Sequence, residues 1–251
     1  MTILLRPLAA ALLLGTTLGA QPAPAKKAGT FEGSASLGFS QTRGNADATT
    51  INVANKLKYA VVGWQVQQDL TFFYGEAEGK VNANFWNGGL RAQRGVGSRV
   101  GAYVVGRFDR NVLQGISRRF EEGVGLDITA VSTTAQALTL ALGVSQFQQV
   151  LTPGSTSAFD GSFPAARAAL DFRHKFSPNA TFQQTAEYLP NLSESSAYLV
   201  NTESTIVAPL LSKLAVKIAY VIRYNNAPPV RNNVPLRTTD TFFSSGVTYS
   251  F

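Results

Sequence analysis

The chain has 251 residues and a formal net charge of +7, with 15% charged and 45% hydrophobic residues. The charged share is far below the roughly 25% of ordinary soluble domains, and the absence of cysteine excludes disulfides and a lipid-modified N-terminal cysteine. A basic chain could bind nucleic acid, but we find no basic cluster interleaved with aromatic residues, so we expect no nucleic-acid partner.

The first 20 residues have the layout of a secretory signal peptide. Arg6 supplies a positive start, residues 8–14 are only Ala and Leu, and small residues follow. The apolar run is too short to cross a bilayer, which takes about 20 residues. We predict a signal peptide at 1–20, cleaved after Ala20 or as late as Ala25, and a short periplasmic linker at 21–30.

Residues 31–251 alternate between apolar and polar side chains, which is typical of β-strands with one lipid-facing side. Near the end of the chain, Val216 and Ile218 fall on one side of such a strand, whereas Lys217 falls on the other. The alternation predicts twelve strands, at 31–40, 46–61, 64–74, 83–93, 99–109, 118–130, 135–148, 163–174, 180–189, 196–207, 213–225 and 240–251.

The connections between these strands alternate in length. Those after the even-numbered strands are short, whereas most of those after the odd-numbered strands are longer and polar, the longest at residues 149–161 and 226–239. Tight periplasmic turns and longer external loops are typical of outer-membrane barrels. We therefore predict an all-β fold at 31–251, a transmembrane antiparallel up-and-down β-barrel with both termini in the periplasm of a bacterial cell.

The C-terminal strand carries the sharpest local pattern. Phe243, Val247, Tyr249 and Phe251 share one face, while small polar residues occupy the other. A terminal Phe preceded by apolar residues at alternate positions resembles the recognition signal of the barrel-assembly machinery, so we expect that machinery as a partner during biogenesis.

Two motifs resemble the salt-induced outer membrane protein family, a domain family of unknown function. The first is the turn Ser40-Gln-Thr-Arg-Gly-Asn-Ala-Asp47, with Gly44, Asn45 and Asp47 at the family's turn positions and Arg43 where the family usually has Ser. The second is Gly106-Arg-Phe-Asp-Arg110, followed by Arg118-Arg-Phe120. The resemblance spans nearly the whole mature chain and implies an outer-membrane barrel without a known substrate. Hairpin geometry alone also explains the first motif, because Gly and Asn tolerate positive φ.

Alternation places a balanced set of charged residues inside the barrel. Buried charges are costly unless they are paired, so these residues either line a selective pore or form a polar core that closes it. We expect the constricting charges to be Arg107 with Asp109, and Arg167 with Asp171 and Arg173; Glu203 and Arg223 are further candidates. The whole inward set is Glu32, Lys56, Lys58, Asp69, Arg91, Arg107, Asp109, Glu121, Asp127, Arg167, Asp171, Arg173, Glu187, Glu203, Lys217 and Arg223.

Cationic residues also fall in the expected external loops. They could bind lipopolysaccharide phosphates through charge-assisted hydrogen bonds or simply be solvated, and the expected membrane partners are outer-membrane lipid and lipopolysaccharide. These cations are Arg43, Lys80, Arg110, Arg118, Arg119, Arg231 and Arg237.

Enzymatic residues are sparse. Serine hydrolysis needs a base, usually His, and the single histidine, His174, falls on the lipid side with Ser177 across a turn. One His and no Cys offer no transition-metal site, so we expect no metal, cofactor or catalytic residue.

Three functions remain open from the sequence. The first is a narrow or largely closed channel of the salt-induced type, acting in envelope permeability or osmotic adaptation. The second is a structural or adhesive barrel whose loops bind lipopolysaccharide or a partner. The third, an outer-membrane hydrolase, is disfavoured by the residues above, and the sequence does not indicate the oligomeric state.

Overall fold

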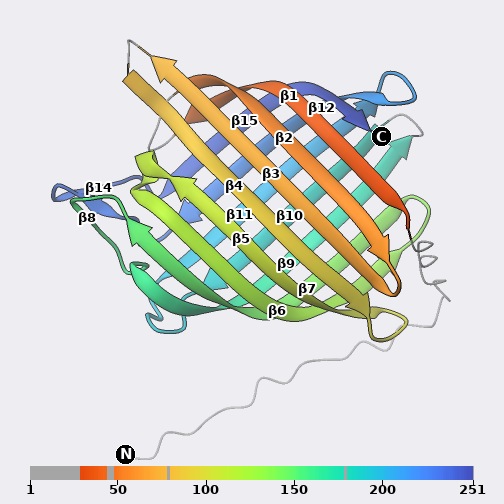
Figure 1. The fold of residues 1–251 in the computed structure, drawn as a ribbon, viewed down its shortest axis with the longest axis horizontal. Coiled ribbons are helices and arrows are strands. Elements are labelled where there is room, and N and C mark those ends of the chain that lie inside the picture. Colours follow the sequence, from red (N-terminus) through yellow and green to blue (C-terminus); the bar gives the residue numbers. More distant parts are fainter. Residues whose placement is uncertain (1–28, 44–47, 78–79, 178–179, 251) are drawn as a thin grey trace, which may run out of the picture.

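The computed structural model describes residues 29–43, 48–77, 80–177 and 180–250. They form a closed barrel of twelve antiparallel strands, which confirms the predicted fold class (Figure 1). The barrel strands are β1 (Phe31–Arg43), β2 (Ala48–Val61), β3 (Trp64–Ala77), β4 (Lys80–Gly95), β5 (Val100–Asn111), β6 (Ile116–Ser132), β7 (Gln136–Leu151), β9 (Gly161–Ser177), β10 (Ala180–Pro190), β11 (Tyr198–Pro209), β12 (Leu214–Asn225) and β15 (Thr239–Ser250). The predicted signal peptide and most of the predicted linker lie outside the described residues and stay predictions.

Strand β15 closes the barrel against β1. Leu37 of β1 lies opposite Val53 of β2 on one side and Val247 of β15 on the other. Every barrel strand therefore has two neighbours, and the barrel that the described residues form has no open edge. A membrane requires this, because backbone groups at an open edge would have no partner in hydrocarbon.

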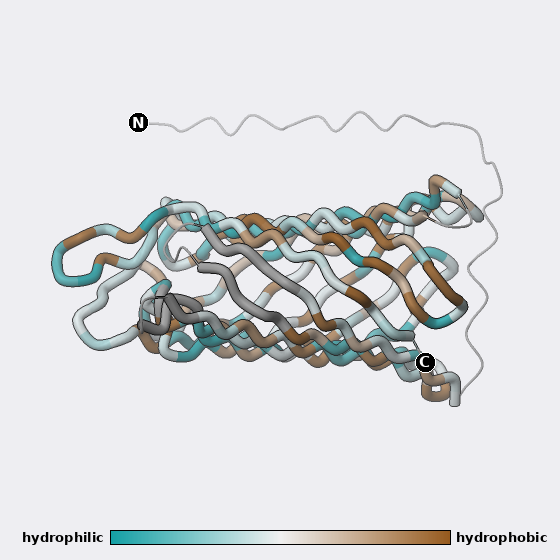
Figure 2. The backbone as a smooth tube through the Cα atoms, turned by 90° about the horizontal axis from the view of Figure 1, so that it is seen from above, coloured by the Kyte–Doolittle hydropathy of each residue, from teal (hydrophilic) through white to brown (hydrophobic). Residues whose placement is uncertain are grey.

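The outer surface is apolar along the strands. Three members of the proposed assembly signal lie on it, with Phe243, Val247 and Tyr249 exposed by 41%, 47% and 43%; Phe251 lies outside the described residues. Brown, hydrophobic segments recur along the strands in Figure 2. Glu122 is an exception to this apolar surface, because it is charged and faces outward between Phe120 and Val124. Within the described residues, no helix is both long enough and apolar enough to cross a membrane.

The two ends of the barrel differ. At one end, called the turn end, short turns such as residues 62–63 and 210–213 join the strands. At the other, the loop end, longer connections contain a 3-10 helix, η1 (Val112–Gln114), and a three-stranded sheet of β8 (Ser155–Thr156), β13 (Val230–Arg231) and β14 (Val234–Pro235). This sheet lies beyond the barrel rim, at the left of Figure 1.

Several strands extend further toward the loop end than the alternation predicts. The expected connection at residues 75–82 shrinks to residues 78–79, because β3 continues to Ala77 and β4 begins at Lys80. Backbone hydrogen bonds continue the ladder whether or not the side chains alternate. Hydropathy therefore marks the lipid-facing part of a strand rather than its full length.

Close backbone packing seals part of the inner wall. Tyr103 of β5 lies opposite Gly125 of β6, which in turn lies opposite Gly143 of β7. The Tyr103 side chain, 3% exposed, lies over both glycines. A Cβ atom at Gly125 would lie 2.5 Å from Tyr103 Oη, and one at Gly143 would lie 2.6 Å from it. The ring can occupy this place because both glycines lack a side chain.

We predict that Gly143→Ala destabilises the barrel by about 1–3 kcal/mol, because the added methyl group overpacks the wall under Tyr103. Urea unfolding in lipid vesicles measures this change. Gly106→Ala is the matched control, since a Cβ atom there meets nothing within 4 Å. Equal unfolding midpoints for the two variants would contradict the prediction.

Candidate functional site

A cavity of about 640 Å³ runs inside the barrel between residues of both ends. Lys56 and Lys58 line it toward the turn end, and Pro228 and Arg237 line it at the loop end. The structure places all seven singled-out lumen residues on this cavity: Arg107, Asp109, Arg167, Asp171, Arg173, Glu203 and Arg223. Of the wider inward set, Glu32 and Lys217 are not part of the lining.

Four charged side chains from four strands meet inside the barrel, and we call them the four-charge cluster: Arg107 of β5, Glu121 of β6, Arg167 of β9 and Glu187 of β10. Arg107 Nη1 lies 3.2 Å from Glu121 Oε2 and 3.2 Å from Glu187 Oε1. Arg167 Nη1 lies 2.8 Å from Glu121 Oε1, and its Nη2 pairs with Glu187 Oε1. Each cation thus bridges both anions.

Neutral donors complete the shell of the two carboxylates. Ser145 Oγ donates to Glu121 Oε1 at 2.8 Å, and Asn201 Nδ2 donates to Glu187 Oε2 at 3.2 Å. The side chains of Arg167 and Glu121 are each only 5% exposed. Such burial is tolerable because each charge has two opposite partners and each carboxylate accepts a further hydrogen bond.

A second ionic contact crosses the barrel. Asp109 Oδ1 lies 3.7 Å from Arg223 Nη1, and Asp109 Oδ2 lies 3.6 Å from Arg119 Nη1. In the order around the barrel, β5 and β12 are six places apart among twelve strands, so Asp109 and Arg223 come from opposite walls. This contact narrows the lumen in the half of the barrel nearer the loops.

The charges singled out from the sequence find their partners on other strands. Arg107 pairs with glutamates of other strands and not with Asp109, and Asp171 accepts a hydrogen bond from Gln183 Nε2 at 2.9 Å. Residues two apart on a strand are held almost 7 Å apart by the backbone. Neighbouring and facing strands therefore supply the partners.

The sequence interpretation wrongly counted Arg119 among the external loop cations, which were expected either to bind lipopolysaccharide or to be solvated. Strand β6 already begins at Ile116, so Arg119 points inward and lines the cavity. Arg237, another predicted loop cation, also lines the cavity, whereas Arg231 stays in the loop-end sheet, where its Nη2 donates to the carbonyl of Val112 at 2.6 Å.

A further ionic pair lies closer to the turn end. Arg91 of β4 donates two hydrogen bonds to Asp127 of β6, at 2.7 and 2.6 Å, and its guanidinium lies 3.7 Å from the centre of the Tyr103 ring. Lys217 and Glu203 form a looser, half-exposed pair at 3.6 Å. The charged lining is therefore held mainly by cross-strand pairs.

Two aromatic groups inside the barrel were missed by the sequence analysis. Phe73, Phe85 and Phe242 form a triangle with ring centres 5.8–6.0 Å apart, and Arg223 lies 4.5 Å above the Phe85 ring. The alternation places these three rings on the inward face of their strands. An apolar residue at an inward position, however, looks like a break in the alternation, so the rings were not recognised.

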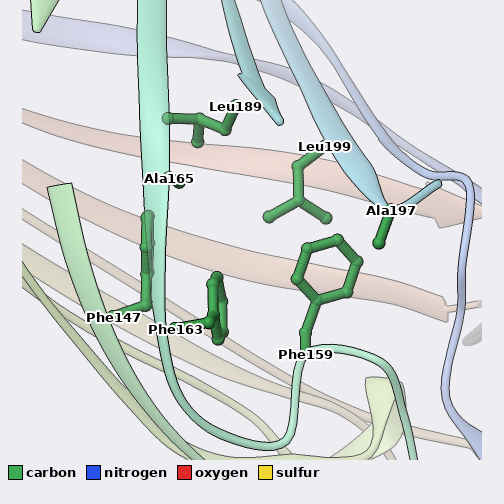
Figure 3. Close-up of a cluster of buried hydrophobic side chains, with 7 residues drawn as sticks. All are labelled: Phe147, Phe159, Phe163, Ala165, Leu189, Ala197 and Leu199. Atoms are coloured by element: carbon green, nitrogen blue, oxygen red, sulfur yellow. The ribbon is translucent and has the colours of Figure 1, made fainter. Parts of the chain in front are cut away.

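The second group packs near the loop end, where Figure 3 shows Phe159 facing Phe163 and Leu199. Phe147 and Phe163 stack with centres 5.0 Å apart, and Phe159, carried by the connection at residues 152–160, is only 1% exposed. The complete group is Phe147, Phe159, Phe163, Ala165, Leu189, Ala197 and Leu199. It fills one side of the barrel mouth.

Loop residues also reach across the mouth. Gln114 of η1 donates to Asp240 of β15, on a distant strand of the barrel. In the connection at 191–197, Ser196 Oγ donates to Glu194 Oε1 at 2.7 Å, which lowers the pKa of that exposed carboxyl. The first contact joins distant parts of the loop end, whereas the second is local to one connection.

The remaining candidate residues do not join the site. The ring of His174 lies on the outer side between Phe172 and Phe176, and its Nδ1 lies 3.3 Å from the amide of Gln136. The family turn residues Gly44, Asn45 and Asp47 lie outside the described residues. Among the residues that are described, no three His, Cys, Asp or Glu side chains are grouped as metal ligands would be.

The closed fold, apolar exterior and charged interior define a transmembrane β-barrel with a narrow polar lumen. The family described as "Protein of unknown function, DUF481" matches residues 35–251, and the chain belongs to that family. A comparison with curated proteins yields no match.

Solved structures share the fold at low sequence identity. The NanC porin matches with a TM-score of 0.57 and 9% identity, over 86% of this chain and 98% of the porin. The translocator domain of the autotransporter NalP from Neisseria meningitidis matches with a TM-score of 0.51 and 12% identity, over 90% of this chain and 91% of the domain. These likenesses bear on the barrel fold alone.

We predict that Arg167→Leu destabilises the barrel by about 3–5 kcal/mol, because it leaves two buried carboxylates with one shared cation. Lys217→Leu, which breaks the half-exposed pair with Glu203, should cost less than about 1 kcal/mol. Unfolding of both variants in the same vesicles provides the comparison. A smaller loss for Arg167→Leu than for Lys217→Leu would show that the four-charge cluster does not hold the walls together.

Proposed function

We propose that the protein is a channel of the bacterial outer membrane that passes small polar solutes and has no catalytic activity. The observation that carries this proposal is the cavity lined by charged side chains from the turn end to the loop end, inside a barrel with an apolar exterior. Its volume falls within the 300–1,000 Å³ of small-molecule sites. Such a lumen suits solutes of a few heavy atoms rather than polymers.

The four-charge cluster and Asp109 are the proposed constriction. Arg107 reaches from β5 to Glu187 of β10, four places away around the barrel, so its side chain spans part of the lumen. Asp109 and Arg223 meet from opposite walls. A solute must pass beside these charges, which would exclude large or strongly apolar molecules.

The surplus charge of the lining favours anions. Nine Lys or Arg side chains and seven Asp or Glu side chains line the cavity, which leaves a net charge of +2. Lys56 and Arg173, both exposed, stand on opposite walls toward the turn end. Rings of cationic side chains select anions in pores, so we expect a moderate preference for small anions.

The physiological role follows as part of the same proposal. A narrow channel with weak charge selectivity suits envelope permeability or osmotic adaptation, the first of the three functions that the sequence left open. The barrel-assembly machinery and lipopolysaccharide remain proposed partners, in biogenesis and at the external loops respectively.

A second candidate rests on the sheet of β8, β13 and β14. It lies beyond the barrel rim and exposes Val234 by 63%. An ordered projection of this kind is a suitable platform for an adhesive or structural contact outside the cell.

Planar-bilayer recording of the refolded protein tests the channel. We predict discrete conductance steps, with larger steps for Arg107→Ala because the truncated side chain no longer reaches Glu187. Glu122→Gln is the control, since Glu122 faces outward and should leave the conductance unchanged. A folded, heat-modifiable barrel without steps would overturn the channel and favour the adhesive alternative.

Ion selectivity gives a separate prediction. Replacing both Lys56 and Arg173 with Glu changes the lining charge by −4, from +2 to −2, and should invert the preference from anions to cations. The reversal potential in a KCl gradient should then change sign. A reversal potential that does not move would mean that ions do not pass these residues.

A further inference from the structure

The lipid-facing surface of β2 and β3 carries two carboxamides at positions where lipid-facing residues are expected to be apolar. On the outward face of β3, Gln68 lies between Val66 and Leu70. Its neighbours on the adjacent strands are Leu57 of β2 and Leu90 of β4. Leu70 and Leu90 are 52% and 56% exposed, so Gln68 lies within the apolar belt rather than at its rim. Asn55 occupies the corresponding outward place on β2, facing Leu70.

The amide nitrogen of Gln68 is not satisfied within the described barrel. Its Nε2 atom is covered by neighbouring atoms and has no hydrogen-bond acceptor among the described residues. Asn55 Nδ2 makes only a long contact of 3.4 Å to the carbonyl of Ser34. A polar group without a partner is costly in hydrocarbon, where no water can replace the missing bond. The pairing proposed below therefore requires a rotamer change that turns the Gln68 amide outward.

A second outward amide, on the other side of the barrel, shows the contrast. Gln184 of β10 accepts a hydrogen bond from Ser204 Oγ at 2.5 Å and donates to the carbonyl of Thr185 at 2.9 Å. It therefore needs no partner from outside. The same residue type thus has internal partners on one wall and lacks them on the other.

We propose that the face of β1, β2 and β3 is a dimer interface in the membrane, and that its occupant is a second copy of this chain. A primary amide carries two donors and one acceptor oxygen, so two Gln68 side chains related by a two-fold axis can form a reciprocal pair. Two copies with the same orientation in one membrane place Gln68 at equal depth. Isologous contacts of this kind are the commonest symmetry of oligomers.

Small residues beside the amides allow close approach. Gly33 and Ala35 of β1 lie next to this face, opposite Leu57 and Asn55 of β2. Contacts within membranes depend on small residues that let backbones approach and on polar side chains that bond across the interface. Both features occur together on this wall.

Site-specific cross-linking tests the interface in native membranes. The chain has no cysteine, so Ala35→Cys should form a disulfide-linked dimer under a membrane-permeant oxidant, whereas Ala186→Cys on the other wall should stay monomeric. Adding Gln68→Leu should suppress the Ala35→Cys dimer, and adding Gln184→Leu should not.

Sedimentation equilibrium in neutral detergent measures how strongly Gln68 contributes to dimer formation. Gln68→Leu should raise the dimer dissociation constant roughly three- to twentyfold for each hydrogen bond lost, while Gln184→Leu leaves it unchanged. Heat modifiability shows that each variant still folds, since leucine is favourable on a lipid face. A monomeric wild type, equal cross-linking of both cysteine positions, a product with another protein, or indifference to Gln68→Leu would each overturn the proposal.

Discussion

Closure of the backbone hydrogen-bond ladder is the constraint on which the rest of this structure depends. Hydrocarbon offers no partner to an unpaired N–H or C=O group, so every strand must have two neighbours. The pairing of β1 with both β2 and β15 meets this demand. Once the ladder closes, side chains face lipid and the lumen in alternation. Those facing lipid are expected to be apolar, whereas those facing the lumen can be polar or charged.

The lumen of a twelve-stranded barrel is narrow enough for side chains of distant strands to meet. Charges placed there cannot all keep a full hydration shell, and the structure compensates by pairing them across strands. The four-charge cluster joins β5, β6, β9 and β10, and Asp109 with Arg223 joins opposite walls. The same contacts that make the interior tolerable also limit its width, so stability and permeability depend on the same residues.

Much of the fold could be predicted from the sequence because alternation reports directly on the two faces of a strand. The period of two located all twelve strands and placed residues such as Arg167 and Arg223 inside. The ionic partners could not be predicted, because they depend on which walls face each other after closure. Glu121 and Glu187 had the correct parity but nothing local linked them to Arg107.

Strand ends and loop contacts were harder to predict from the sequence. Arg119 was counted with the external loop cations because it lies at the start of the predicted strand at 118–130, whereas β6 begins two residues earlier, at Ile116. Phe159 enters the barrel mouth from a connection whose composition is that of an ordinary polar loop. Contacts made by loops over the lumen depend on three-dimensional closure, which local pattern does not encode.

Polar residues inside and outside the barrel all need a hydrogen-bond or ionic partner, and not all of them find one. Inside, Glu121 finds Arg107, Arg167 and Ser145, and so a buried charge is retained. Outside, Gln184 bonds to Ser204, whereas the amide nitrogen of Gln68 finds no acceptor among the described residues of its own barrel. An unsatisfied group in hydrocarbon is a reason for association, because only another protein can supply the bond. The closed ladder thus gives the chain a polar interior suited to solutes and, on the wall of β2 and β3, one polar feature that a single copy does not satisfy.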